Sequence, residues 1–94
     1  MKKIVVKDGF AFVYFLSSFY TDKSILNSIE VYSQFFSAEV SKLGKYSIVK
    51  LRNLDSSYSL EILANEFSNY VLSCEYNGEL VEVRENEGVV SNGF

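Results

Sequence analysis

The sequence predicts an α+β fold with two layers, in which an antiparallel sheet of about four to five strands carries two helices on one face. Three observations predict it. Two pairs of short β-rich segments are each joined by a turn that contains glycine. Each pair is followed by a segment with apolar residues at helical spacing, and 94 residues suffice for one domain. The predicted order is therefore ββαββα, with an optional last strand.

The first hairpin is predicted over residues 2–16. Asp8-Gly9 separates two apolar runs and is typical of a type I′ turn, which needs two residues with positive φ. Both alternating sets of side chains in the second run, residues 10–16, are apolar, whereas a strand with one wet face alternates apolar and polar residues. We therefore expect a central strand whose second face is covered. The residues predicted to form an interface there are Phe10, Phe12 and Tyr14.

The first helix is predicted from Thr21, which can cap it, to about Phe36. Asp22 in the first turn suits the positive end of the helix dipole. An apolar stripe then follows at helical spacing, formed by Ile25, Ile29, Tyr32 and Phe36.

A second hairpin is predicted from two short alternating runs, residues 38–42 and 45–51, which flank Leu43-Gly44. Tyr46 and Ile48 should point to one side of the sheet. The side chains expected on the other side are Ser47, Val49 and Leu51.

The second helix should follow the turn at Asp55 and stop at Asn77-Gly78, since both residues tolerate the left-handed conformation. Its inner stripe is predicted to contain Leu60, Leu63, Ala64, Phe67, Val71 and Cys74. The side chains expected to face away from the core are those of Glu61, Asn65, Ser68 and Asn69. Residues 80–84 could add a last strand, so the predicted domain is 1–84, followed by a flexible acidic and polar tail over 85–94.

Composition excludes several chemistries. Without histidine there is no His-based acid–base pair, and a single cysteine allows neither an internal disulfide nor a thiolate zinc cluster. We therefore expect no enzyme, no metal and no cofactor. The lone cysteine and the lack of a membrane-spanning apolar stretch favour a cytoplasmic protein.

Charge is unevenly distributed along the chain. Residues 1–52 carry a balance of +4 and residues 53–94 a balance of −7, which give the net −3. The acidic total argues against a general nucleic-acid binder. The asymmetry can instead orient a protein partner or self-association, or simply reflect two solvated faces.

One motif points to RNA. Residues 9–15, Gly-Phe-Ala-Phe-Val-Tyr-Phe, resemble the RNP1 segment of RNA-recognition motifs. The resemblance implies that Phe10, Phe12 and Tyr14 stack bases on an open sheet. Asp8 stands where that family has a basic residue, and the segment lies earlier in the chain than RNP1 does.

A second resemblance concerns the second predicted helix. Residues 63–72, with Glu66-Phe67-x-Asn69-x-x-Leu72, resemble a helix of the HxsD family, and the similarity in plan covers roughly residues 10–75. That family comprises small accessory proteins encoded with radical-SAM enzymes in His-Xaa-Ser peptide-maturation systems. Ser73-Cys74 replaces an arginine of the family.

These residues suggest a binding site on the helix. Glu66 and Asn69 are i, i+3 neighbours that could clamp a peptide backbone or, alternatively, bond to the fold itself. Leu72 and Tyr76 lie among polar residues and could form a contact patch. The first hypothesis is a peptide- or protein-binding accessory module, with a radical-SAM enzyme as one candidate partner. The alternatives are a single-stranded RNA-binding domain and a structural subunit that forms homodimers or larger homo-oligomers.

Overall fold

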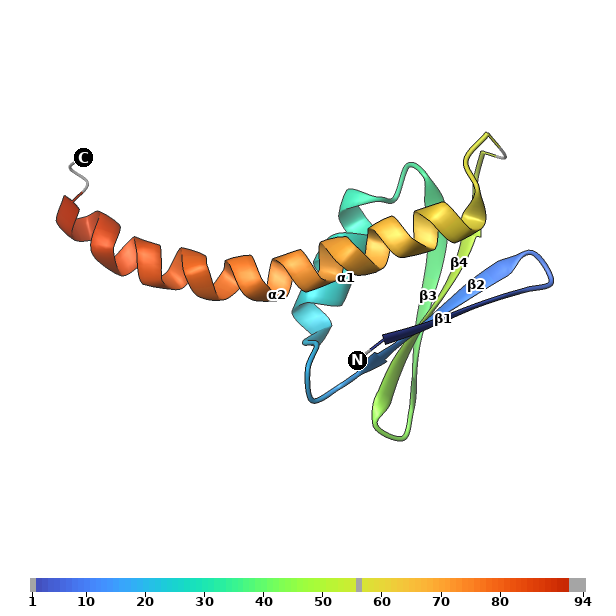
Figure 1. Ribbon diagram of the computed structural model, residues 1–94, viewed down its shortest axis with the longest axis horizontal. Helices are drawn as coiled ribbons and strands as arrows, with labels where there is room; N and C mark the ends of the chain where they lie inside the picture. Colours follow the sequence, from blue (N-terminus) through green and yellow to red (C-terminus); the bar gives the residue numbers. More distant parts are fainter. Residues whose placement is uncertain (1, 56, 92–94) are drawn as a thin grey trace.

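The computed structural model describes residues 2–55 and 57–91, with the backbone alone described for residues 2 and 77–91 (Figure 1). It confirms the predicted class and order, ββαββα. The elements are β1 (Lys2–Lys7), β2 (Phe10–Leu16), α1 (Asp22–Val31), β3 (Phe36–Leu43), β4 (Tyr46–Asn53) and α2 (Leu60–Ser91). None of the helices, as far as they are described, is both long and apolar enough to cross a membrane.

The four strands form one antiparallel sheet in the order β1-β2-β4-β3, so β2 and β4 are central. Both helices lie on the same side of this sheet (Figure 1). The run from β2 to α2 follows the chain order of a ferredoxin-like βαββαβ unit without its last strand. β1 takes the edge position next to β2 instead.

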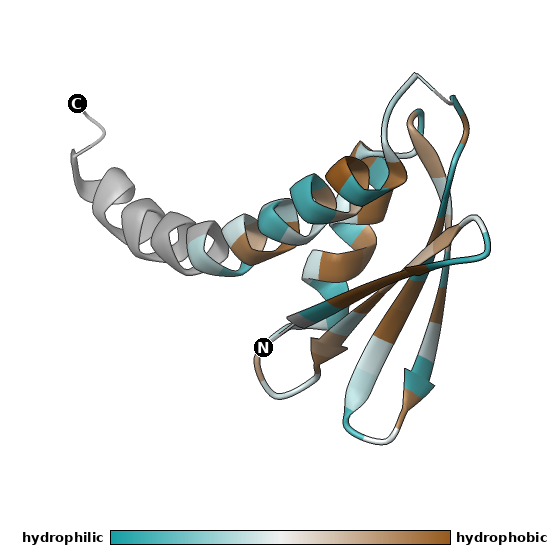
Figure 2. Ribbon diagram, turned by 45° about the vertical axis from the view of Figure 1, so that its right-hand side comes forward, coloured by the Kyte–Doolittle hydropathy of each residue, from teal (hydrophilic) through white to brown (hydrophobic). Residues whose placement is uncertain are grey.

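The core lies between the sheet and the helices. Hydrophobic segments run along the strands and parts of both helices (Figure 2). Phe67 of α2 is fully buried, and its ring lies 5.9 Å from that of Phe15 and 5.3 Å from that of Phe36. Aromatic pairs at such distances add about 0.5–1.5 kcal/mol beyond the area that they bury. The other buried apolar residues of the sheet in this core are Ala11, Val13, Val49 and Leu51.

The first glycine turn behaves as predicted, whereas the second lies one residue later than predicted, at Gly44-Lys45, because Leu43 still belongs to β3. Asp8 and Gly9 have φ values of 53° and 81°, the two positive angles that a type I′ turn requires. Burial alternates along β2 and β4, with Ser47, Val49 and Leu51 inside and Tyr46 and Ile48 on the other side, as their spacing indicates. The strands are slightly longer than predicted, because β3 begins at Phe36 and β4 ends at Asn53.

The first helix ends earlier than predicted, at Val31 instead of near Phe36. Its start is correct: the Thr21 hydroxyl accepts a hydrogen bond from the Ser24 N–H at 3.2 Å. After Val31, the N–H groups of Phe35 and Phe36 bond to the Tyr32 carbonyl and turn the chain into β3. In this turn the Tyr32 ring stacks on that of Phe36, with the ring centres 5.8 Å apart.

The second helix differs most from prediction. Asn77-Gly78 does not stop it, and the backbone of residues 80–84 is helical, so the optional last strand is wrong. A glycine inside a helix costs about 1 kcal/mol relative to alanine, which a continued hydrogen-bond ladder can offset. The backbone of the predicted tail is helical to Ser91, and residues 92–94 lie outside the described residues. Ser68 is buried, not outward, and its hydroxyl donates to the Asn65 carbonyl at 2.9 Å.

Candidate functional site

The side of the sheet opposite the helices is the candidate functional site, and we call it the open face. Directly paired residues of an antiparallel sheet share a face, so the register defines it. Lys3 pairs with Tyr14, Phe12 with Lys50, and Tyr14 with Ile48. The open face comprises Lys3, Val5, Lys7, Phe10, Phe12, Tyr14, Leu16, Ser37, Glu39, Ser41, Leu43, Tyr46, Ile48, Lys50 and Arg52.

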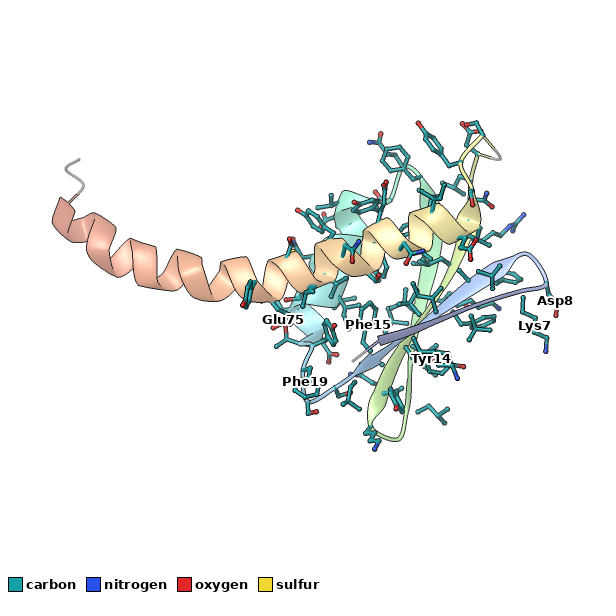
Figure 3. All side chains as sticks on the ribbon, viewed as in Figure 1. Lys7, Asp8, Tyr14, Phe15, Phe19 and Glu75 are labelled. Atoms are coloured by element: carbon teal, nitrogen blue, oxygen red, sulfur yellow. The ribbon has the colours of Figure 1, made fainter. Side chains whose placement is uncertain are left out.

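The two faces of the central strands differ sharply in burial. Val13, Phe15 and Val49 on the helix side are 0% exposed. Their neighbours Phe12 and Tyr14 on the open face are only partly buried. Figure 3 shows Phe15 toward the helices and Tyr14 on the opposite side of the sheet. Within the described residues, no helix or loop lies over the open face (Figure 1).

Aromatic rings form pairs across the open face. The Phe10 and Phe12 rings lie 6.4 Å apart, and the Tyr14 ring meets that of Tyr46 edge-on at 6.1 Å. The ammonium group of Lys50 lies 4.2 Å from the centre of the Phe10 ring. This cation–π contact places a positive charge directly over the aromatic surface.

The centre of the open face is hollowed. An open depression of ≈ 530 Å³ lies over β2, β4 and β3. Its floor is mostly apolar and its rim carries one cation and one carboxylate. The lining residues are Phe12, Tyr14, Glu39, Val40, Ser41, Ile48 and Lys50.

The open face is positive although the protein is acidic. It carries four basic side chains and one carboxylate, a net +3, whereas the whole chain carries −3. Such a field attracts negatively charged partners and speeds their encounter. The charged residues are Lys3, Lys7, Lys50 and Arg52, with Glu39 opposing them.

The structure separates the two groups of residues predicted from the sequence. Phe10, Phe12 and Tyr14 lie together on the open face, whereas the helix group lies on α2, which covers the other side of the sheet (Figure 1). The helix group is exposed, with Leu72 at 48% and Tyr76 at 69%. The two groups therefore belong to different surfaces.

Glu66 has a neighbour within the fold. The pKa of Tyr32 is raised, first by burial and then by the charges of Glu66 and Tyr70. The Glu66 carboxylate thus acts on Tyr32 electrostatically, while its own side chain is exposed. Asn69 also has an interaction partner in the chain.

Sequence reasoning missed a polar junction between the two helices. The Glu75 carboxylate accepts hydrogen bonds from the Thr21 backbone N–H and from the Thr21 hydroxyl, the latter at 2.7 Å. Nearby, the Cys74 sulfur lies 3.6 Å from the Ser28 hydroxyl oxygen. Burial acts to raise the pKa of Glu75, but hydrogen bonds from Thr21 and Ser24 outweigh it and lower the pKa. The only sign of this contact in the sequence is that Glu75 directly follows Cys74, the last residue of the predicted apolar stripe.

Comparison with protein-family models, curated proteins and solved structures finds no significant match to this chain.

Proposed function

We propose that the protein is a recognition module without catalytic activity, and that its open face binds an acidic, partly apolar segment of a protein partner. One observation carries the proposal: four aromatic rings lie on an uncovered sheet face whose charge is opposite in sign to that of the protein. Their residues are Phe10, Phe12, Tyr14 and Tyr46.

Burial of the apolar part of the open face by a partner would be favourable in free energy. Burying apolar surface contributes roughly 25 cal/mol per Å², and contiguous exposed apolar patches on small proteins commonly mark interaction sites. Aromatic residues that are already paired on a rigid sheet lose little conformational freedom on binding. The cations around them select a partner segment that carries acids.

The resemblance to the HxsD family supports a more specific form of the proposal. In this form the module assists a radical-SAM peptide-maturation enzyme by helping it to find its precursor. The partner segment would come from the enzyme or from the precursor peptide. Glu66, Asn69, Leu72 and Tyr76 on α2 would then form a second contact surface, so that one module could hold two partners.

Capture experiments with surface variants test the proposal. The tagged wild-type protein and the variants Tyr14→Lys and Ile62→Lys are used to capture partners from the native host, and the partner is then purified. Ile62 is 57% exposed on α2 and provides the matched control. We expect wild type and Ile62→Lys to bind the purified partner with equal Kd and Tyr14→Lys to lose at least tenfold in affinity. Equal binding by all three proteins would exclude the open face.

A second candidate function is single-stranded RNA binding. It is favoured because the aromatic residues of the RNP1-like segment share the open face with four cations, the combination that stacking platforms use. A titration with labelled single-stranded oligonucleotides at low and high salt distinguishes it. Salt-sensitive binding at micromolar protein, lost in Tyr14→Lys, would favour RNA over a protein partner.

A further inference from the structure

The C-terminal segment of the chain matches the open face in charge and character. Residues 77–94 contain four glutamates and one arginine, a net −3 against the +3 of the open face. The segment also carries apolar residues, among them Leu80, Val81 and Val83. It therefore has the composition that the open face selects.

The segment cannot reach the open face of its own chain. α2 crosses the opposite side of the sheet and continues beyond both the sheet and α1 (Figure 1). At about 1.5 Å per residue, the part from residue 77 to Ser91 spans roughly 22 Å away from the core. Folding back around the sheet would require the helix to break, so the open face within reach is that of another molecule.

The projecting part of α2 is also about as long as the strands of the open face. A strand of seven residues spans roughly 23 Å at about 3.3 Å per residue, close to the length of the projecting helix. Direct stacking of two open faces is disfavoured by comparison, because it would place two +3 surfaces against each other. Four strands spaced about 4.8 Å apart over that length cover roughly 450 Å². Stacking of two open faces would therefore also bury less than the ~800 Å² per partner of a standard interface.

We propose that, when no other partner is bound, residues 77–91 of one copy lie across the open face of a second copy, in a reciprocal dimer. The inference rests on the proposed role of the open face as a surface for acidic, apolar segments. Reciprocal exchange covers both open faces and closes the assembly at two copies, so it does not propagate into a filament.

Charge reversal in the full chain tests this dimer by sedimentation velocity and light scattering. The face variant is Lys50→Glu with Arg52→Glu, and the segment variant is Glu82→Lys with Glu85→Lys. A second face variant, Lys3→Glu with Lys7→Glu, covers the case in which the first fails to fold. Glu30→Lys, on the exposed side of α1, is the control. Circular dichroism checks the fold of each variant.

We expect the wild type and Glu30→Lys to have twice the chain mass at low salt and each reversal variant to have the single-chain mass. An equimolar mixture of the face and segment variants should recover the double mass, because their charges are again complementary. A monomeric wild type, a dimer that survives both reversals, or a mixture that stays monomeric would overturn the inference. If the wild type is monomeric while Tyr14→Lys still loses the captured partner, the proposed function stands and only the dimer is excluded.

Discussion

At the residue scale, Glu75 joins parts of the chain that are 54 positions apart. Its carboxylate lies at the N-terminus of α1, where the partial positive charge of the helix favours an anion. The same charge, after burial, contributes to the raised pKa of Tyr20. Glu75 thus fixes α1 against α2 on the helix side of the sheet and leaves the open face untouched.

Acid should weaken the fold through this residue. Because the pKa of Glu75 is lowered in the folded state, the unfolded chain binds more protons between the folded pKa and its own pKa of about 4.3. The stability that Glu75 contributes is therefore complete above the unfolded pKa and is lost as the pH falls through the folded pKa. We expect Glu75→Gln to lower the free energy of unfolding by about 1 kcal/mol at pH 7, a modest value for a partly exposed charged hydrogen bond.

Urea unfolding at several pH values measures this effect. The difference between wild type and Glu75→Gln should shrink steadily below pH 4. The variant Glu30→Gln, at an exposed position on α1, serves as the control and should leave the pH profile unchanged. A Glu75→Gln deficit that stays constant down to pH 2 would show that the loss is steric and not ionic.

At the element scale, the β1–β2 hairpin builds the aromatic part of the open face. Its turn sets the register that pairs Val5 with Phe12 and Lys3 with Tyr14. A slip of one residue would exchange the two faces of a strand and place the open-face residues against the helices. The positive φ angles at Asp8 and Gly9 are therefore a requirement for the site as well as for the turn.

Replacing Gly9 by alanine should destabilise the protein by about 1–2 kcal/mol, the cost of a left-handed conformation for a residue with a Cβ atom. No atom lies within 4 Å of the added Cβ, so the cost is conformational and not steric. Asp8→Asn is the matched variant and should be neutral or slightly stabilising, because asparagine is favoured in type I′ turns. Urea unfolding measures both, and an equal loss in the two variants would contradict this explanation.

At the scale of the whole molecule, the two sides of the sheet differ in burial and in charge. The helix side contains the described hydrophobic core, from Ala11 on β2 to Val71 on α2. The open side carries paired aromatic rings and a net positive charge on an otherwise acidic protein. Because the described core lies on the helix side, the fold does not need the aromatic residues of the open side to be buried, and this side is the one that we propose for binding.

This division predicts that the chain truncated after Tyr76 keeps its stability. The truncation retains the described core and the junction of Glu75 with Thr21, so the free energy of unfolding should change by no more than about 0.5 kcal/mol. Urea unfolding at a protein concentration low enough to keep wild type monomeric makes the comparison. A loss of several kcal/mol would mean that residues 77–94 belong to the core.

Local patterns explain how much of the candidate site could be predicted. The Asp8-Gly9 turn and the apolar run after it predict a central strand with Phe10, Phe12 and Tyr14 on one face, and the structure places them there. The contribution of β4 could not be predicted, because it depends on the long-range pairing of β2 with β4. That pairing brings Tyr46, Ile48 and Lys50 to the same surface.

By itself, the sequence determined the α+β class, the order of the elements and the faces of the central strands, because turns and side-chain periodicity act over a few neighbouring residues. Only the tertiary structure decided where the helices end and how the distant parts meet. α1 ends at Val31, where a turn at Tyr32 leads into β3, and the carboxylate of Glu75 reaches Thr21. Each of these outcomes depends on the balance between local backbone preferences and contacts between segments that are remote in the chain. Those contacts exist only once the segments are packed together.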